Sequence, residues 1–147
     1  MIKKLRVRAI IEHDGLYLLV RNKYTPNFWC LPGGGVEQNE DITSALEREI
    51  IEELGIKPDV GNLLYVHTLK GGNGYELPAF YFHIKNGQDY VNFEVSSSSH
   101  GKLELLEAKF LDITNAHVLP SFLKHELPEL RSSDFKHSTI VRTTDLE

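Results

Sequence analysis

The sequence predicts a mixed α/β fold in which helices pack on a curved, mixed sheet. Segments rich in branched aliphatic and aromatic residues stand before, between and after two segments whose apolar residues recur at helical spacing. This order favours a sandwich of helices and sheet. A chain of 147 residues buries roughly two-thirds of its extended surface, which is enough for one core. We expect a single domain over residues 1–130 and a tail over residues 131–147.

The first strands surround a predicted hairpin. Residues 5–11 and 17–20 are largely apolar, and Asp14 and Gly15 between them tolerate the positive φ angles of a tight turn. Residues 28–31 predict a short strand or the entry to a loop, which Pro32 and the three glycines 33–35 bring to an end.

The clearest helix follows these glycines. Gly55 stands where the C-terminal cap of this helix belongs. The apolar positions at helical spacing are Ile42, Ala45, Leu46, Ile50 and Leu54.

The second half of the chain predicts more strands and one short helix. Strands are expected at residues 63–69 and 78–84, joined by a glycine-containing loop, and at residues 109–113 after a mobile, serine-rich loop. Residues 120–127 predict a helix with proline in its first turn, and Pro128 is expected to end it. The tail predicts an edge strand around Ile140, and its last two residues are consistent with a vector-derived remnant.

Composition and charge limit the ligands of this chain. The net charge of −5 argues against binding long nucleic acid, so an anionic substrate would need a metal cation between itself and the protein. Cys30 is the only cysteine, which excludes an internal disulfide and a cysteine-based zinc site and fits a reducing compartment. No segment has the ~18 consecutive apolar residues of a membrane span or the apolar stretch of a signal peptide. We therefore expect a cytoplasmic protein that binds no membrane.

The predicted helix carries acidic residues where core residues are expected. At about 100° per residue, Glu49 and Glu53 fall inside its apolar arc, and Glu52 lies at the edge of that arc. Charges on a helix usually form a solvated face, but two carboxylates here interrupt the apolar stripe. Burial of an uncompensated carboxylate costs several kcal/mol, and Arg48 alone cannot balance all of these.

A divalent cation is the simplest compensation. Because Glu49, Glu52 and Glu53 are spaced i, i+3 and i+4, their oxygens can converge on one point beside the helix. Hard oxygen ligands favour Mg²⁺ or Mn²⁺, which bridge carboxylates to substrate phosphates. Gly34 and Gly35 form either a simple turn or a backbone that approaches a phosphate or a metal closely, and we favour the second function.

The segment from Gly34 to Ile56, GGVEQNEDITSALEREIIEELGI, resembles a complete Nudix (MutT-like) box, and Trp29, Leu31 and Pro32 before it are usual in that family. The box is specific for the superfamily and only weakly specific for substrate. The resemblance implies an α/β/α Nudix sandwich and Mg²⁺-dependent hydrolysis of a nucleoside diphosphate linked to some further group.

The resemblance also implies roles for single residues. Arg48 would orient Glu49 through an ion pair, with Glu40 in a supporting role. Glu52 or Glu53 can take the proton of the attacking water. The implied metal ligands are the carbonyl of Gly33 and the side chains of Glu49, Glu52 and Glu53.

The family often supplies a further glutamate from outside the box as a ligand or a base. Glu94, Glu104 and Glu107 flank the serine-rich loop. Glu104 or Glu107 is favoured, and Glu107 resembles the acidic residue that often precedes the late strand of the family. At least two of the three are expected to be ordinary solvated residues.

A nucleobase is expected to stack on aromatic side chains of strands near the metal. Our candidates are Phe28, Tyr75 and Phe80, although most aromatic residues in strands belong to the core. The three consecutive aromatic residues Phe80, Tyr81 and Phe82 cannot all line one site, because Phe80 and Phe82 share one face of their strand and Tyr81 takes the other. His67 is expected to be a sheet residue rather than a ligand.

Markers of the substrate outside the box are few. Eighteen residues separate Ile56 from Tyr75, which resembles a marker tyrosine of diadenosine polyphosphate hydrolases. Gly72 stands where ADP-ribose hydrolases often have proline. We favour a nucleoside triphosphate or similar small nucleotide, with dinucleoside polyphosphates and ADP-ribose as alternatives.

Two other functions are compatible with the same fold. A non-catalytic Nudix module that senses nucleotides would be expected to carry a broken set of box glutamates, and the set here is complete. An isomerase would need a reactive cysteine, and Cys30 in a predicted strand is a poor candidate. We expect a monomer or a homodimer.

Overall fold

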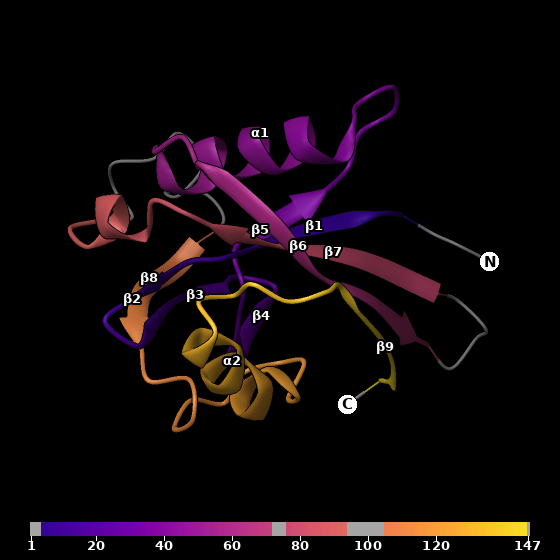
Figure 1. The fold of residues 1–147 in the computed structure, drawn as a ribbon. Coiled ribbons are helices and arrows are strands. Elements are labelled where there is room, and N and C mark those ends of the chain that lie inside the picture. The colour runs from indigo at the N-terminus through magenta and orange to yellow at the C-terminus, as the bar shows by residue number, and fades with distance from the viewer. Residues whose placement is uncertain (1–3, 72–75, 94–104, 147) are drawn as a thin grey trace.

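The computed structural model describes residues 4–71, 76–93 and 105–146. Within these ranges it contains two α-helices, α1 (Ile42–Leu54) and α2 (Leu123–Ser132), and a short 3₁₀ helix, η1 (Gly87–Tyr90). Figure 1 shows α1 and α2 on opposite sides of the strands. The predicted mixed α/β sandwich is therefore confirmed.

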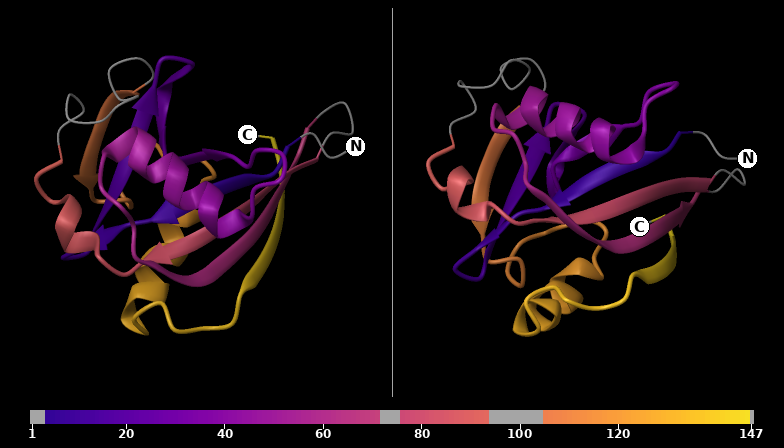
Figure 2. Two further views of the ribbon diagram at one scale, coloured as in Figure 1. Left: turned by 90° about the horizontal axis from the view of Figure 1, so that it is seen from above. Right: turned by 45° about the horizontal axis from the view of Figure 1, so that its top comes forward.

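The larger sheet has five strands in the order β5-β1-β7-β6-β9. β1 runs parallel to β7 and β9 runs parallel to β6, whereas β5 and β1, and β7 and β6, are antiparallel. Figure 2 shows β9 along the outer side of β6. The bounds of these strands are β5 (Gly33–Gly35), β1 (Arg6–Ile10), β7 (Glu76–Ile84), β6 (Val60–Lys70) and β9 (Ile140–Asp145).

The smaller sheet is built around β3, which pairs antiparallel with its three neighbours. Its strands are β2 (Glu12–His13), β3 (Leu16–Asn22), β4 (Thr25–Cys30) and β8 (Leu105–Leu111). Asp14 and Gly15 join β2 to β3 with φ angles of 50° and 81°, so the predicted hairpin turn is confirmed.

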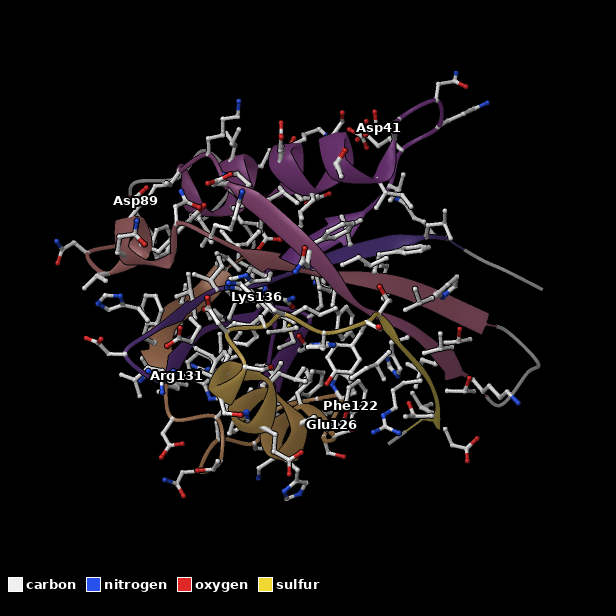
Figure 3. The ribbon with its side chains drawn as sticks, in the orientation of Figure 1. Asp41, Asp89, Phe122, Glu126, Arg131 and Lys136 are labelled. Atoms are coloured by element: carbon white, nitrogen blue, oxygen red, sulfur yellow. The ribbon has the colours of Figure 1, made fainter. Side chains whose placement is uncertain are left out.

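Local contacts fix both ends of α1. The side chain of Asp41 accepts a hydrogen bond from the backbone N–H of Ser44 at 2.7 Å, and Figure 3 shows Asp41 at the start of the helix. Gly55 has a φ of 74° and donates its N–H to the carbonyl of Ile51 at 2.8 Å, which confirms the predicted cap. These caps satisfy backbone groups that a helix leaves without intrahelical partners.

Two apolar clusters hold the helices to the sheets. The α1 cluster includes Leu46 and Ile50 together with Val7 of β1 and Leu18 of β3. The α2 cluster includes Leu123, Leu127, Tyr17 and Tyr65. Figure 3 shows Phe122 and Glu126 on the side of α2 that faces β9, and the hydroxyl of Tyr65 donates to Glu126 at 2.9 Å.

Two predicted elements that precede α2 differ from the structure. The glycines 33–35, which were expected to end the preceding strand, form β5 because β1 provides a complete antiparallel partner. The predicted strand at 109–113 is displaced: β8 ends at Leu111, and the side chain of Asp112 then binds the N–H of Thr114 at 3.0 Å in a turn. Residues 72–75 of the glycine-containing loop and the serine-rich loop lie outside the described residues.

The predicted helix at 120–127 is wrong at both ends, because α2 begins at Leu123 and continues through Pro128 to Ser132. Leu123 and Leu127 are fully buried, and the hydroxyl of Tyr17 donates to the carbonyl of Leu127 at 3.0 Å. These tertiary contacts outweigh the local cost of a proline inside a helix.

Neither helix of the described residues is long and apolar enough to cross a membrane.

The attachment of α1 can be tested with two adjacent isoleucines. Ile50 is fully buried, whereas Ile51 is 42% exposed. We expect Ile50→Ala to lower the free energy of unfolding by about 2–5 kcal/mol, because it leaves a cavity between α1 and β1. Ile51→Ala should cost less than about 1 kcal/mol. Urea denaturation measures both, and equal losses would contradict this packing.

Candidate active site

The acidic residues of α1 lie where the sequence places them. Glu53 is 9% exposed and is buried on the same side of the helix as Leu46 and Ile50. The side chains of Glu49 and Glu52 are 17% and 33% exposed. The apolar arc of α1 is therefore interrupted by carboxylates that are largely removed from water.

Arg48 contacts the carboxylates around it through all three of its nitrogens. Its Nε and Nη2 donate to the two oxygens of Glu40 at 2.7 and 2.9 Å. Its Nη1 donates to Glu49 at 3.1 Å and to Glu52 at 3.3 Å. Nη2 also donates to the carbonyl of Gly35 at 3.0 Å, which joins the helix to β5. The ion pair expected between Arg48 and Glu49 is present, and Glu40 is the bidentate partner.

These contacts shift the pKa of several groups. Hydrogen bonds from Arg48 and from the backbone of Glu37 lower the pKa of Glu40 to about 2. The hydrogen bond to Glu40 raises the pKa of Arg48, so both groups are charged at neutral pH. Burial raises the pKa of Glu49. The hydrogen bond from Arg48 acts in the opposite direction but does not cancel the effect of burial. Glu49 is therefore a carboxylate that a further cation would stabilise.

The backbone of β5 makes room for Glu49. Gly34 pairs with Val7 of β1 and faces α1, and a Cβ atom at Gly34 would lie 2.4 Å from the carboxyl carbon of Glu49. At Gly33 the φ is 146°, and a Cβ would lie 2.0 Å from the carbonyl oxygen of Val7. Gly33 therefore requires glycine, whereas a side chain at Gly34 would displace the carboxylate of Glu49, which lies against bare backbone.

The donor set fits a hard divalent cation. Glu49, Glu52 and Glu53 offer carboxylate oxygens from one side of a helix next to the side-chain-free backbone of β5, which suits Mg²⁺ or Mn²⁺. Among the residues that the structure describes, no three acidic, histidine or cysteine side chains already surround one point. The predicted convergence is thus not present in this arrangement, because Nη1 of Arg48 holds Glu49 and Glu52.

The glutamates outside the helix are placed only in part. Glu107 lies on β8 and forms ion pairs with Arg21 and, at 3.2 Å, with Lys109. The hydrogen bond from Arg21 is the main cause that lowers its pKa, which makes it a weaker base. Glu94 and Glu104 lie outside the described residues.

A cavity of about 560 Å³ opens on the face of the larger sheet opposite α1. Residues of β1, β6 and β7 form one wall, and residues of β3, β4 and the turn between them form another. The lining includes Arg6, Arg8, Tyr24, Phe28 and Tyr81. A mostly apolar cavity with a few polar groups is the usual form of a small-molecule site.

The predicted aromatic residues do not meet in this cavity. Phe28 lines it, whereas Phe80 packs in the α1 cluster on the other face of the sheet. The two aromatic residues lie on different faces because successive side chains of a strand alternate. Tyr81 therefore lines the cavity and its neighbour Phe80 does not. Tyr75 lies outside the described residues. His67 is a buried sheet residue whose ring nitrogens contact Tyr81 at 2.9 Å and Thr144 at 2.8 Å.

The arginines of the cavity were not predicted from the sequence. Arg6 and Arg8 occupy alternate positions of β1 and therefore share one face of the strand. The alternation of basic and aliphatic residues in KLRVR was the available signal. This alternation indicates a ligand site only when β1 is seen to lie inside the sheet, between β5 and β7.

Comparisons with known proteins agree with this fold. A family model described as the NUDIX domain matches residues 3–129. An ADP-ribose pyrophosphatase of Methanocaldococcus jannaschii is 34% identical over 140 residues, which cover 92% of this chain and 69% of the relative. The nucleoside triphosphatase NudI of Escherichia fergusonii is 49% identical over 55 residues, or 35% of this chain and 39% of the relative. A NUDIX hydrolase structure from Nitrosomonas europaea has a TM-score of 0.70 at 19% identity, and the match covers 99% of this chain and 81% of the chain from Nitrosomonas europaea.

The glycines of β5 allow a test of the cation site. In Gly34→Ala the new methyl group meets the end of the Glu49 side chain, which can move, so the fold should persist while Mn²⁺ binds about 10- to 100-fold more weakly. Titration followed by electron paramagnetic resonance measures this affinity. Gly33→Ala meets backbone instead and should lower the melting temperature. Unchanged Mn²⁺ binding in a folded Gly34→Ala variant would contradict the site.

The pair of Glu40 and Arg48 predicts a pH dependence of stability. The pKa of Glu40 is about 2 in the folded chain and about 4.3 when unfolded, so its ionised form is favoured by folding. Its contribution is complete above about pH 4.3 and disappears as the pH falls toward about 2. The difference in melting temperature between wild type and Glu40→Gln should therefore be constant from pH 5 to 8 and shrink below about pH 4. A difference that stays constant down to about pH 2 would show that Glu40 is not held by Arg48.

Proposed function

The chain belongs to the NUDIX family and is a hydrolase of pyrophosphate linkages, and we propose that its substrate is a nucleoside triphosphate or a similar small nucleotide. Members of this family generally act with divalent metals, and we propose Mg²⁺ here, with Mn²⁺ able to replace it. The observation that carries the proposal is the acidic side of α1. Arg48 holds Glu49 and Glu52 there, Glu49 lies against the bare glycines of β5, and Glu53 is buried on the same helix.

Each residue of this side has a proposed role. Glu49, Glu52 and Glu53 would hold the cation, and the carbonyl of Gly33 is a further candidate ligand. When bound, the cation neutralises charge on the phosphoryl oxygens and lowers the pKa of a coordinated water. Arg48 positions Glu49 and Glu52 through Nη1, and Glu40 holds Arg48 through its two short hydrogen bonds.

Proton transfer falls to a carboxylate near the attacking water. We propose Glu52 or Glu53, because both lie on the cation side of α1. Glu107 is a second candidate, although Arg21 and Lys109 already stabilise its ionised form. As water adds to phosphorus, the bridging P–O bond breaks and the leaving phosphate takes up the charge. Gly34 and Gly35 allow the diphosphate to approach the backbone closely.

The relatives support two classes of substrate. The name of NudI supports a nucleoside triphosphate. The relative from Methanocaldococcus jannaschii, whose match covers 92% of this chain, is named an ADP-ribose pyrophosphatase. ADP-ribose is therefore the second candidate. Dinucleoside polyphosphates are a further alternative. In each case the cavity lined by Phe28 would take the nucleoside.

Product analysis separates these alternatives. The protein would be incubated with Mg²⁺ and a panel of nucleoside triphosphates, dinucleoside polyphosphates and ADP-ribose in ¹⁸O-labelled water. We expect a nucleoside monophosphate and pyrophosphate from a triphosphate, with the label on one product. Tight nucleotide binding without any hydrolysis product, in Mg²⁺ or in Mn²⁺, would instead support a non-catalytic module.

Substitution of a single carboxylate tests the catalytic role of α1. Glu53→Gln keeps the shape of the side chain but removes its charge, so we expect a folded protein with turnover reduced by about 10²–10⁴-fold. Glu47→Gln on the same helix is the matched control and should retain turnover. Steady-state kinetics on the best substrate of the panel measures both, and wild-type turnover in Glu53→Gln would contradict the assignment.

A further inference from the structure

A row of cations lies beside the glycines of β5, on the face of the larger sheet opposite α1. Arg6 and Arg8 line the cavity, and Lys4, two residues before Arg6, lies over β5, where a Cβ at Gly35 would be 2.4 Å from its Cε. At about 3.3 Å per residue, the extended chain from Lys4, which precedes β1, to Arg8 spans roughly 13 Å.

These cations form no direct ion pair with a carboxylate of the described residues. Among the described residues, no carboxylate lies within 4.0 Å of Lys4, Arg6 or Arg8, although the chain as a whole has a net charge of −5. The contact found for Arg8 is a hydrogen bond from Nη1 to the carbonyl of Leu31 at 3.3 Å. With respect to the part of the chain that the structure describes, most of the N–H donors of the two guanidinium groups therefore remain available for a ligand.

The ordinary structural explanation does not apply to this row. Lysine and arginine often protect an exposed sheet edge from pairing with other chains, but β1 lies inside the sheet, between β5 and β7. Like charges at neighbouring positions repel one another, and burial together with Arg8 lowers the pKa of Arg6. A compensating anion is the simplest reason for such an arrangement.

The row is also close to the cation site. β5 carries no side chains, so only backbone separates Arg6 and Arg8 on one face from Glu49 on the other. Coulombic interactions join Glu49 to both arginines across β5. An anion bound at the row would therefore lie next to a cation held by α1.

We propose that Lys4, Arg6 and Arg8 bind the phosphate chain of the substrate as it passes from the cation site to the cavity. This inference rests on the proposed function for its choice of substrate. A row of three cations is longer than a diphosphate and matches a chain of three or more phosphates. The site therefore favours a nucleoside triphosphate or a dinucleoside polyphosphate over ADP-ribose, which has only two phosphates.

Binding without turnover tests the row separately from the hydrolase activity. Isothermal titration with inorganic tripolyphosphate and with pyrophosphate, in EDTA, needs neither a metal nor catalysis. We expect wild type to bind tripolyphosphate more tightly than pyrophosphate. Arg6→Gln and Arg8→Gln should each weaken tripolyphosphate binding roughly tenfold, or about 1.4 kcal/mol. Lys57→Gln, an exposed cation elsewhere, is the matched control and should bind as wild type.

A conservative variant separates the loss of charge from a structural effect of the substitution. Both Arg8→Lys and Arg8→Gln remove the guanidinium group that binds the carbonyl of Leu31. Only Arg8→Lys keeps the positive charge, so it should retain most of the tripolyphosphate binding. Equal binding of the two phosphates by wild type, or wild-type affinity in both glutamine variants, would overturn the inference. A protein that binds tripolyphosphate through the row but hydrolyses no nucleotide would refute the proposed function and leave the row in place.

Kinetics then connects the row to the substrate. In the active protein, Arg6→Gln and Arg8→Gln should raise KM for a nucleoside triphosphate roughly tenfold and KM for ADP-ribose by less. Equal increases for both substrates would overturn the selection for longer phosphate chains.

Discussion

The Arg48 guanidinium contacts the carboxylates of Glu37, Glu40, Glu49 and Glu52. The rest of the site depends on this excess of negative over positive charge. Glu40 takes the bidentate contact, so Glu49 and Glu52 share a single nitrogen. One positive charge cannot neutralise this group, and carboxylates that are partly removed from water cost several kcal/mol without compensation. The excess negative charge is what a divalent cation would balance.

The short glycine strand β5 lets charges on the two faces of the larger sheet act together. On one face Gly34 makes room for Glu49, and on the other Lys4 and Arg6 extend along the strand. With any other residue in β5, side chains would fill the space on both faces. The proposed cation site and the proposed anion site are thus separated by little more than backbone. This arrangement would suit a substrate whose phosphates contact a metal while its nucleoside enters the cavity.

The sequence predicted those parts of the fold that depend on local patterns. The spacing of Leu46 and Ile50 predicted α1, and the acidic interruption at Glu49 and Glu53 was visible on the same helical wheel. Elements that depend on distant partners were predicted less well. β5 exists because β1 pairs with it, and α2 continues through Pro128 because its buried face outweighs the local cost of proline. The cavity could not be predicted, since its walls come from strands far apart in the sequence.

The central claim is that the acidic side of α1 binds a divalent cation, and Mn²⁺ binding in the absence of substrate measures this most directly. Electron paramagnetic resonance titration should show a site in wild type and in Glu47→Gln, and a loss of affinity of at least tenfold in Glu49→Gln. Wild-type Mn²⁺ affinity in Glu49→Gln, with the fold intact, would contradict the account.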